Sequence, residues 1–185
     1  MIYVFLADGF EECEAVAPVD MLRRAALDVK IVKVGGNAGD KKVKSSHNLE
    51  IIADIHESEA VTNGLEMIVF PGGGEGTDHL YESGHVRVFI VHCVQHRLPI
   101  GAICAAPSIL ARLGYLKNIK STAYPTFRHY LSDGGAILEE NKKVVTDGIF
   151  TTAAAAGASV EFGLELVRVI KGEEESKKIA GQILA

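Results

Sequence analysis

The sequence predicts an α/β fold in which a mostly parallel central sheet is covered by helices on both faces, as a three-layer sandwich. Short apolar runs alternate with segments of helical period along the 185 residues. The runs are almost continuously apolar, which is typical of strands that are buried on both faces. One of them passes directly into a helical segment at Cys104, with the outline of a nucleophile elbow. No internal repeat or linker interrupts the pattern, so we expect one domain over residues 1–185.

The first half of the chain predicts four strands and one long helix. Residues 1–7 and 29–34 are unbroken apolar runs, and the helical period over residues 11–27 predicts a helix between them. Pro18 lies inside that helical pattern, so the helix either begins or is kinked there. Residues 35–48, rich in glycine, lysine and serine, predict a loop and hairpin that lead to a short strand near Ile51. The run 67–70 is the next central strand.

The second half predicts the strand at residues 100–103, which precedes the elbow, and four further helices. We expect the helices around residues 85–96, 105–113 and 159–170, with a charged tail helix after Gly172. Apolar runs at 136–138, 144–145 and 149–150 predict short strands. Turns are expected at 133–135 and 147–148, where aspartate and glycine occur together.

Composition excludes several classes of partner. A net charge of −5 gives no reason to expect nucleic acid or an anionic membrane surface, and the basic cluster at residues 41–44 is most simply a solvated hairpin. No apolar run has the length of a membrane span, and the first residues lack the features of a signal peptide. Cys13, Cys93 and Cys104 are an odd number without metal-type spacing, which suits a reducing compartment. We therefore expect a cytoplasmic protein without disulfides.

Cys104 is the strongest candidate for chemistry. Ala102 and Ala106 stand two residues before and after it, and the close chain approach at an elbow admits only small residues at such positions. The positive end of the following helix favours a thiolate, so we expect a lowered thiol pKa. The alternative is that Cys104 is a small buried apolar residue, as most free cysteines are.

Two other loops are expected at the same edge of the sheet, because ligands bind outside the carboxyl ends of parallel strands. The glycine run 72–74 lacks the ending of a phosphate loop, and its backbone N–H groups are better suited to an oxyanion beside the nucleophile. A flexible turn is the alternative. Glu11 and Glu12 are explained as charges in a first helical turn. Glu14, crowded by other acids and the thiol, is expected to have a raised pKa, and either to donate a hydrogen bond to the Cys104 sulfur or to shuttle a proton.

The histidines give a weaker signal. His92 and His96 have the i, i+4 spacing that a metal can use, with His85 near the same face. No acidic ligand accompanies them and the adjacent face is an ordinary core stripe, so we expect no metal, and we assign Cys93 to the core.

Together these motifs resemble the ThiJ/PfpI family, in particular its branch of parkinsonism-associated deglycases and their bacterial relatives. The resemblance covers nearly the whole chain. It is carried by the segments Gly9-Phe10-Glu11-Glu12-Cys13-Glu14, Phe70-Pro71-Gly72-Gly73, Ala102-Ile103-Cys104-Ala105-Ala106-Pro107 and Ser159-Val160-Glu161-Phe162. It implies a flavodoxin-like fold, a homodimer and a reactive Cys104 thiolate beside a protonated Glu14. It also implies an oxyanion or substrate-carbonyl site at the backbone N–H groups of Gly73, Gly74 and Ala105.

The chain departs from this family at three places. Tyr124 stands where several relatives carry a histidine, and a phenol is a poor general base at neutral pH. Residues 152–157 lack an arginine that some relatives place near the pocket, and His47 stands where others have arginine. These differences disfavour anionic substrates and the Cys-His chemistry of a peptidase or amidotransferase-like hydrolase.

The resemblance implies a cofactor-independent, homodimeric cysteine enzyme of the glyoxalase or deglycase type, acting on methylglyoxal-like aldehydes or early glycation adducts. Cys104 and Glu14 are its expected catalytic residues, with Tyr124 as a possible accessory residue. The alternative is an oxidative-stress sensor or chaperone that uses oxidation of Cys104.

Overall fold

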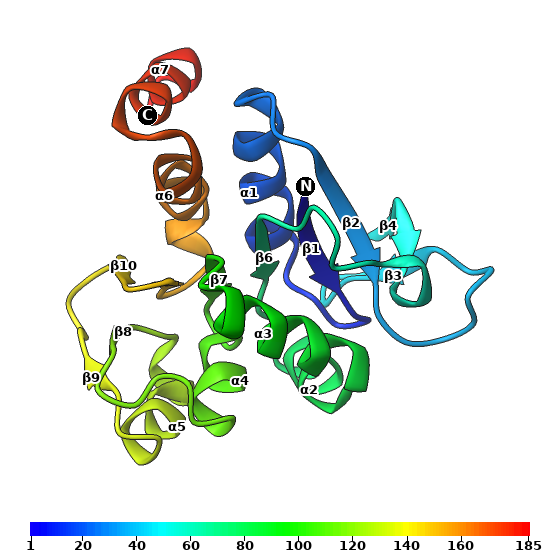
Figure 1. Cartoon of the computed structure of the whole chain (residues 1–185), viewed down its shortest axis with the longest axis horizontal. Helices are drawn as coiled ribbons and strands as arrows, with labels where there is room; N and C mark the ends of the chain where they lie inside the picture. The colour runs from blue at the N-terminus through cyan, green and yellow to red at the C-terminus, as the bar shows by residue number, and fades with distance from the viewer.

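The central sheet has seven strands in the order β10-β11-β7-β6-β1-β2-β5 in the computed structural model, which describes residues 1–185 (Figure 1). The strands are Ile2–Leu6 (β1), Val29–Lys33 (β2), Ile55–His56 (β5), Met67–Phe70 (β6), Ile100–Ile103 (β7), Val144–Asp147 (β10) and Phe150–Ala153 (β11). All neighbouring pairs are parallel except β10 with β11, which form an antiparallel edge hairpin. Starting from β2, the order β2-β1-β6-β7-β11 is that of a flavodoxin-like fold, as expected.

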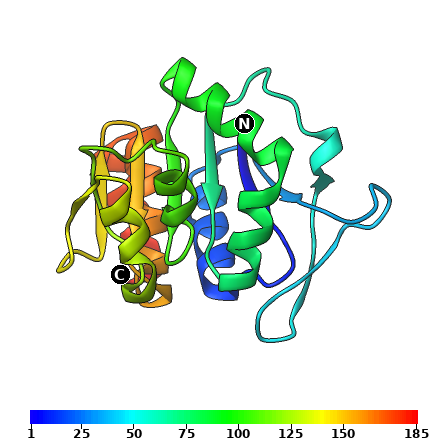
Figure 2. The same ribbon diagram turned by 90° about the horizontal axis from the view of Figure 1, so that it is seen from below.

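Helices cover both faces of this sheet. They are Glu12–Arg24 (α1), Gly74–Glu82 (α2), Gly84–His96 (α3), Pro107–Arg112 (α4), Arg128–Asp133 (α5), Ser159–Lys171 (α6) and Glu173–Ile183 (α7). In Figure 1, α1, α6 and α7 lie on one side of the strands, and α2 to α5 lie on the other. The antiparallel hairpin of β3 (Lys42–Lys44) and β4 (Glu50–Ile52) projects beside β2 and β5, as Figure 2 also shows. A second small sheet pairs β8 (Lys120–Ser121) with β9 (Ile137–Leu138).

The sheet separates two hydrophobic clusters of similar size, with 23 and 21 buried residues. Successive side chains of a strand point to opposite faces. In β1, Tyr3 and Phe5 therefore join the cluster under α2 to α5, whereas Val4 and Leu6 join the cluster under α1 and α6. This two-sided burial explains why the strands are continuously apolar.

Most of the predicted elements are present, with corrections at their ends. The helix expected from residue 105 begins at Pro107, and the first helix begins at Glu12 and contains Pro18, so that a start at Pro18 is excluded. The expected strand at 149–150 extends through Ala153 and pairs in parallel with β7. Helices α2 and α5 were not predicted. None of the helices is both long and apolar enough to cross a membrane.

Candidate functional site

The site lies at the carboxyl ends of three adjacent strands. β1, β6 and β7 are neighbours in the sheet, and the loops that follow them carry the glutamates, the glycine run and Cys104. Strand order reverses between β1 and β6, which is where an open parallel sheet leaves a crevice for ligands. The topology therefore brings together the three loops that the sequence singles out.

Cys104 directly follows β7 and has a left-handed backbone, with φ of 63°. Its N–H donates to the carbonyl oxygen of Ala153 at 2.9 Å, and its own carbonyl oxygen accepts from the N–H of Tyr124 at 2.9 Å. These two bonds hold the strained peptide from both sides. Ala102 and Ala106 are fully buried, as expected for the residues that flank an elbow. The Cys104 side chain itself is partly exposed.

Glu14, in the first turn of α1, is the buried acid of the site, with 1% of its surface exposed. Its Oε2 accepts from the N–H of Gly72 at 2.9 Å, while its Oε1 is buried without a hydrogen-bond partner. Burial is the main cause that raises the pKa of Glu14 to about 7, and the charge of Glu11 acts in the same direction. The Cys104 side chain and the Gly72 N–H lower that pKa. A carboxyl group with this pKa can accept and return a proton near neutral pH.

Gly72 and Gly73 are required by close approaches around the acid and the thiol. A Cβ at Gly72 would lie 2.5 Å from Oε2 of Glu14 and 2.8 Å from Cβ of Cys104. Gly73 has φ of 91°, and a Cβ there would overlap the carbonyl oxygen of Gly9. Only glycine fits at both positions without moving the loops apart.

Two of the three predicted oxyanion donors, the N–H groups of Ala105 and Gly73, act on the Cys104 sulfur. The N–H groups of Ala105 and Gly73 stabilise the Cys104 thiolate, since both lower its pKa. Gly74 is instead the first residue of α2 and lies beside Phe127. Gly72, which was not assigned a role of its own, holds Glu14 rather than the sulfur.

The expected lowering of the Cys104 pKa is wrong for this geometry. Burial raises the pKa of the thiol, and the charge of Glu14 and a hydrogen bond with it raise the pKa further. The two N–H donors oppose this effect without overcoming it. The following helix begins only at Pro107 and has six residues, so its dipole is small and its effect on the thiol pKa is weak. The thiol therefore keeps its proton where Glu14 already ionises.

The remaining candidates lie around this centre or away from it. The side chain of Tyr124 is 44% exposed, and only its backbone N–H binds the elbow. Glu12 faces the hairpin, where it binds the side chain and N–H of His47; these contacts outweigh burial and lower the pKa of Glu12 to about 2. The imidazoles of His92 and His96 stack on each other with their centroids 4.1 Å apart. Cys93 is buried, as predicted.

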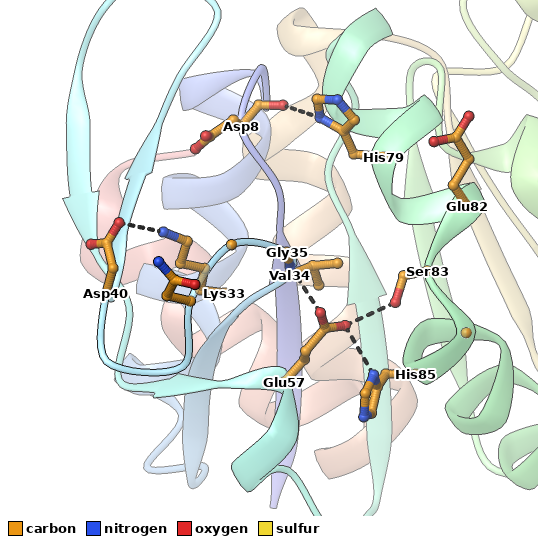
Figure 3. Close-up of a pocket in the computed structure, with 13 residues that line it drawn as sticks. Asp8, Lys33, Val34, Gly35, Asp40, Glu57, His79, Glu82, Ser83 and His85 are labelled. Carbon is orange, nitrogen blue, oxygen red and sulfur yellow. Dashed lines mark hydrogen bonds and ion pairs between the residues drawn. The ribbon is translucent and has the colours of Figure 1, made fainter.

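A pocket of about 560 Å³, drawn in Figure 3, is not lined by Cys104. It is bounded by the loops after β1, β2 and β5 and by the junction of α2 with α3. Glu57 crosses one side of it, accepting hydrogen bonds from Gly35 N–H at 2.9 Å and from the Ser83 hydroxyl at 2.8 Å. Across the pocket, Lys33 pairs with Asp40 at 2.9 Å. The Lys33–Asp40 pair and the hydrogen bonds of Glu57 hold the loops around the pocket together.

Glu11 has a function that sequence reasoning missed. It was explained as a first-turn charge, but it is the N-cap residue of α1, and its Oε2 accepts from the N–H of Glu14 at 2.8 Å. No clear signal in the sequence marked this cap, because glutamate is not among the preferred N-cap residues and the helical period was assigned from residue 11. The sequence also does not show that Gly72 contacts both residues: its carbonyl oxygen accepts from the N–H of Glu11, and its N–H donates to Oε2 of Glu14.

Comparisons with known proteins show the family and agree with the fold. The model of the DJ-1/PfpI family matches residues 1–169. Protein DJ-1 homolog B of Arabidopsis thaliana is 33% identical over 97% of this chain, which spans 40% of that protein's length. Protein dj-1beta of Drosophila melanogaster is 32% identical over 98% of this chain and 95% of its own, and its crystal structure superposes with a TM-score of 0.93. A Schizosaccharomyces pombe protein named glutathione-independent glyoxalase DJ-1 is 28% identical over 94% of this chain and 93% of its own.

Proposed function

Because the chain belongs to the DJ-1/PfpI family, we propose that it is a cofactor-independent cysteine enzyme that converts small α-oxoaldehydes such as methylglyoxal to hydroxy acids. The observation that carries the proposal is the buried Glu14 carboxyl, with a pKa raised to about 7 and one oxygen without a partner, beside a partly exposed thiol. The glyoxalase name of the fission-yeast relative supports the same reaction class.

The first step is attack of the Cys104 sulfur on the aldehyde carbon. Since the thiol keeps its proton, the Glu14 carboxylate takes that proton as the carbon–sulfur bond forms. The N–H groups of Gly73 and Ala105 stabilise negative charge beside the sulfur, and the same donors suit the developing oxyanion. Glu14 then returns this proton to the oxyanion, which yields the hemithioacetal and restores the carboxylate, and no electron acceptor is needed.

The second step moves a proton between the two carbons of the adduct. Glu14 removes the proton from the carbon that bears sulfur and returns it to the neighbouring carbon, while the hydroxyl proton moves to the neighbouring oxygen. This converts the hemithioacetal to a 2-hydroxy thioester. Water then attacks the thioester, releasing the hydroxy acid and restoring the thiol. A single acid–base group with a pKa near the working pH can take up and return the proton in each of these two steps.

Early glycation adducts are a second proposed substrate class, since the carbon that the thiol would attack in them is the former aldehyde carbon. The carboxyl group of Glu14 beside the thiol disfavours substrates that carry a negative charge. This agrees with the lack of arginine in residues 152–157 and with the pairing of His47 to Glu12.

The alternative function, a sensor that oxidises Cys104 to a sulfinate, has less support. Peroxide reacts with thiolates, and the raised pKa of Cys104 keeps the group as a thiol. A thiol that loses its proton only as an aldehyde is attacked suits catalysis better. The hydrolase alternative needs a base such as histidine, and Tyr124 offers the elbow only its backbone N–H.

The deciding experiment incubates pure protein with methylglyoxal, without glutathione, and follows lactate. Cys104→Ser should abolish turnover, and Glu14→Gln should lower it by about 10²–10⁴-fold, the range for a lost general acid–base group. Cys13→Ser, which changes an exposed cysteine outside the site, is the matched control and should keep wild-type turnover. Sulfinate yield after peroxide is measured on the same preparations. Peroxide oxidation without aldehyde turnover in the wild type would favour the sensor.

We also propose that the protein is a homodimer, as in the resemblance described above. The exposed Val16 and Val160 of α1 and α6, with Cys13 nearby in the sequence, support this proposal. Pro18 of α1 is buried against Gly163 of α6. Sedimentation at micromolar concentration tests the proposal, and a monomeric mass contradicts it.

A further inference from the structure

Three hydrogen bonds form a closed circuit around the acid of the site. The N–H of Glu14 donates to Oε2 of Glu11 at 2.8 Å, and the N–H of Glu11 donates to the carbonyl oxygen of Gly72 at 3.0 Å. The N–H of Gly72 in turn donates to Oε2 of Glu14 at 2.9 Å. The circuit joins the start of α1 to the end of β6, and each of its three residues is both a donor and an acceptor.

Glu11 takes part in this circuit through its charged side chain, whereas Gly72 takes part only through its backbone. The carboxylate of Glu11 satisfies an N–H of the first turn that would otherwise lack a partner in the helix. It also holds a negative charge next to Glu14, where a second negative charge is unfavourable. Position and charge at Glu14 thus depend on the same side chain.

We propose that Glu11 is a positioning residue for Glu14, which fixes the acid against Gly72 and places a second negative charge beside it. The inference rests on the proposed function, because it assigns to Glu14 the proton transfers of that reaction. The titratable groups that act on Glu14 are Glu11 in its own turn and Cys104 from the elbow. Glu12 is engaged with the hairpin, and Cys13 is exposed.

The test separates the two contributions of Glu11 with two substitutions. Glu11→Gln keeps an acceptor oxygen at the same distance along the side chain and removes the charge. Glu11→Ala removes both the charge and the cap. Glu12→Gln is the matched control, since it removes the same charge one residue further along without touching the circuit.

The expected result is a shift of the acid limb of kcat/KM toward lower pH in Glu11→Gln, by about 0.5–1 pH unit, because one of the causes that raise the pKa of Glu14 is gone. On that limb Glu11→Gln should be about 3–10-fold more active than the wild type. Its activity at the plateau should remain close to the wild-type value. Glu11→Ala should shift in the same way but lose plateau activity as well, and Glu12→Gln should keep the wild-type midpoint.

A second measurement keeps this inference distinct from the proposed function. The rate of Cys104 alkylation by iodoacetamide is followed against pH in the same four proteins, because the thiol is coupled to Glu14 whether or not an aldehyde is turned over. If the midpoint of the alkylation profile shifts in Glu11→Gln but not in Glu12→Gln, the inference is supported, even if methylglyoxal is not a substrate. Equal midpoints in Glu11→Gln and the wild type overturn it, as does equal plateau activity in Glu11→Ala and Glu11→Gln.

Discussion

The raised pKa of Glu14 makes the stability of the fold depend on pH in a direction opposite to that of most carboxylates. In the folded protein the pKa is raised from 4.5 to about 7, mainly by burial. Below pH 4.5 the acid is protonated in both the folded and the unfolded chain and contributes no difference. Between pH 4.5 and 7 only the unfolded chain loses its proton, so the free energy of unfolding falls as the pH rises. Above pH 7 the penalty is constant.

The substitution Glu14→Gln removes this dependence while keeping an oxygen that can accept the Gly72 N–H. The pKa difference corresponds to about 3 kcal/mol. The stability of Glu14→Gln relative to the wild type should therefore increase by about 3 kcal/mol between pH 4.5 and pH 8. Other titrating groups are shared by the two proteins and cancel in the comparison.

Urea unfolding under reducing conditions at several values between pH 4.5 and 8 measures this difference, because extrapolation to zero urea yields the free energy at each pH. Glu174→Gln, at an exposed glutamate of α7, is the control for the substitution itself. If the difference between Glu14→Gln and the wild type does not change with pH, then Glu14 is not a buried acid with a neutral pKa. Its proposed function in proton transfer would then fail as well.

Three further predictions concern the loops and the core. Gly73→Ala should lose about 3–5 kcal/mol in urea unfolding, because its Cβ meets a backbone carbonyl oxygen at φ of 91°; Gly157→Ala, whose Cβ meets nothing within 4 Å, should change stability by less than about 0.5 kcal/mol. The hydrogen bond and charge of Glu12 raise the pKa of His47, so the pair stabilises the fold below about pH 6.5 and loses this effect as the pH rises through the folded pKa. His47→Ala should accordingly cost more stability at pH 6 than at pH 9, and an equal loss at both would contradict the pairing. Phe162→Ala should lose about 3–5 kcal/mol in thermal or urea unfolding, since the ring is fully buried, and a loss under about 1 kcal/mol would mean that the core around it is loosely packed.

The strands and the arrangement of the site could be predicted because they follow from local pattern and topology. The bounds of β7 are those that its continuous apolar run predicted. A strand that is buried on both faces has no polar residues, so the ends of the apolar run are the ends of the strand. The proximity of the Glu14 loop to the elbow then follows from strand order, because loops at the carboxyl ends of adjacent parallel strands meet.

Helix α2 could not be predicted in the same way, because glycine is a poor helix former and both Gly74 and Gly76 lie in its first turn. The structure shows why propensity is overridden at Gly76, where a Cβ would come within 2.7 Å of the backbone nitrogen of Phe10. The helix keeps its glycine because another loop packs directly on it. The pKa of Cys104 was missed for a related reason, since burial and the charge of a neighbouring acid depend on contacts between distant segments.

The left-handed backbone at Cys104 lowers the stability of the fold at the position that carries the reactive thiol. A residue with a side chain adopts that conformation at a cost of about 1–2 kcal/mol, which glycine does not incur. Selection for a more stable fold alone would therefore replace the cysteine by glycine at this turn. A chain that retains a thiol there accepts a less stable elbow in exchange for a reactive group, as expected where natural selection acts on what the turn does rather than on how firmly it is folded.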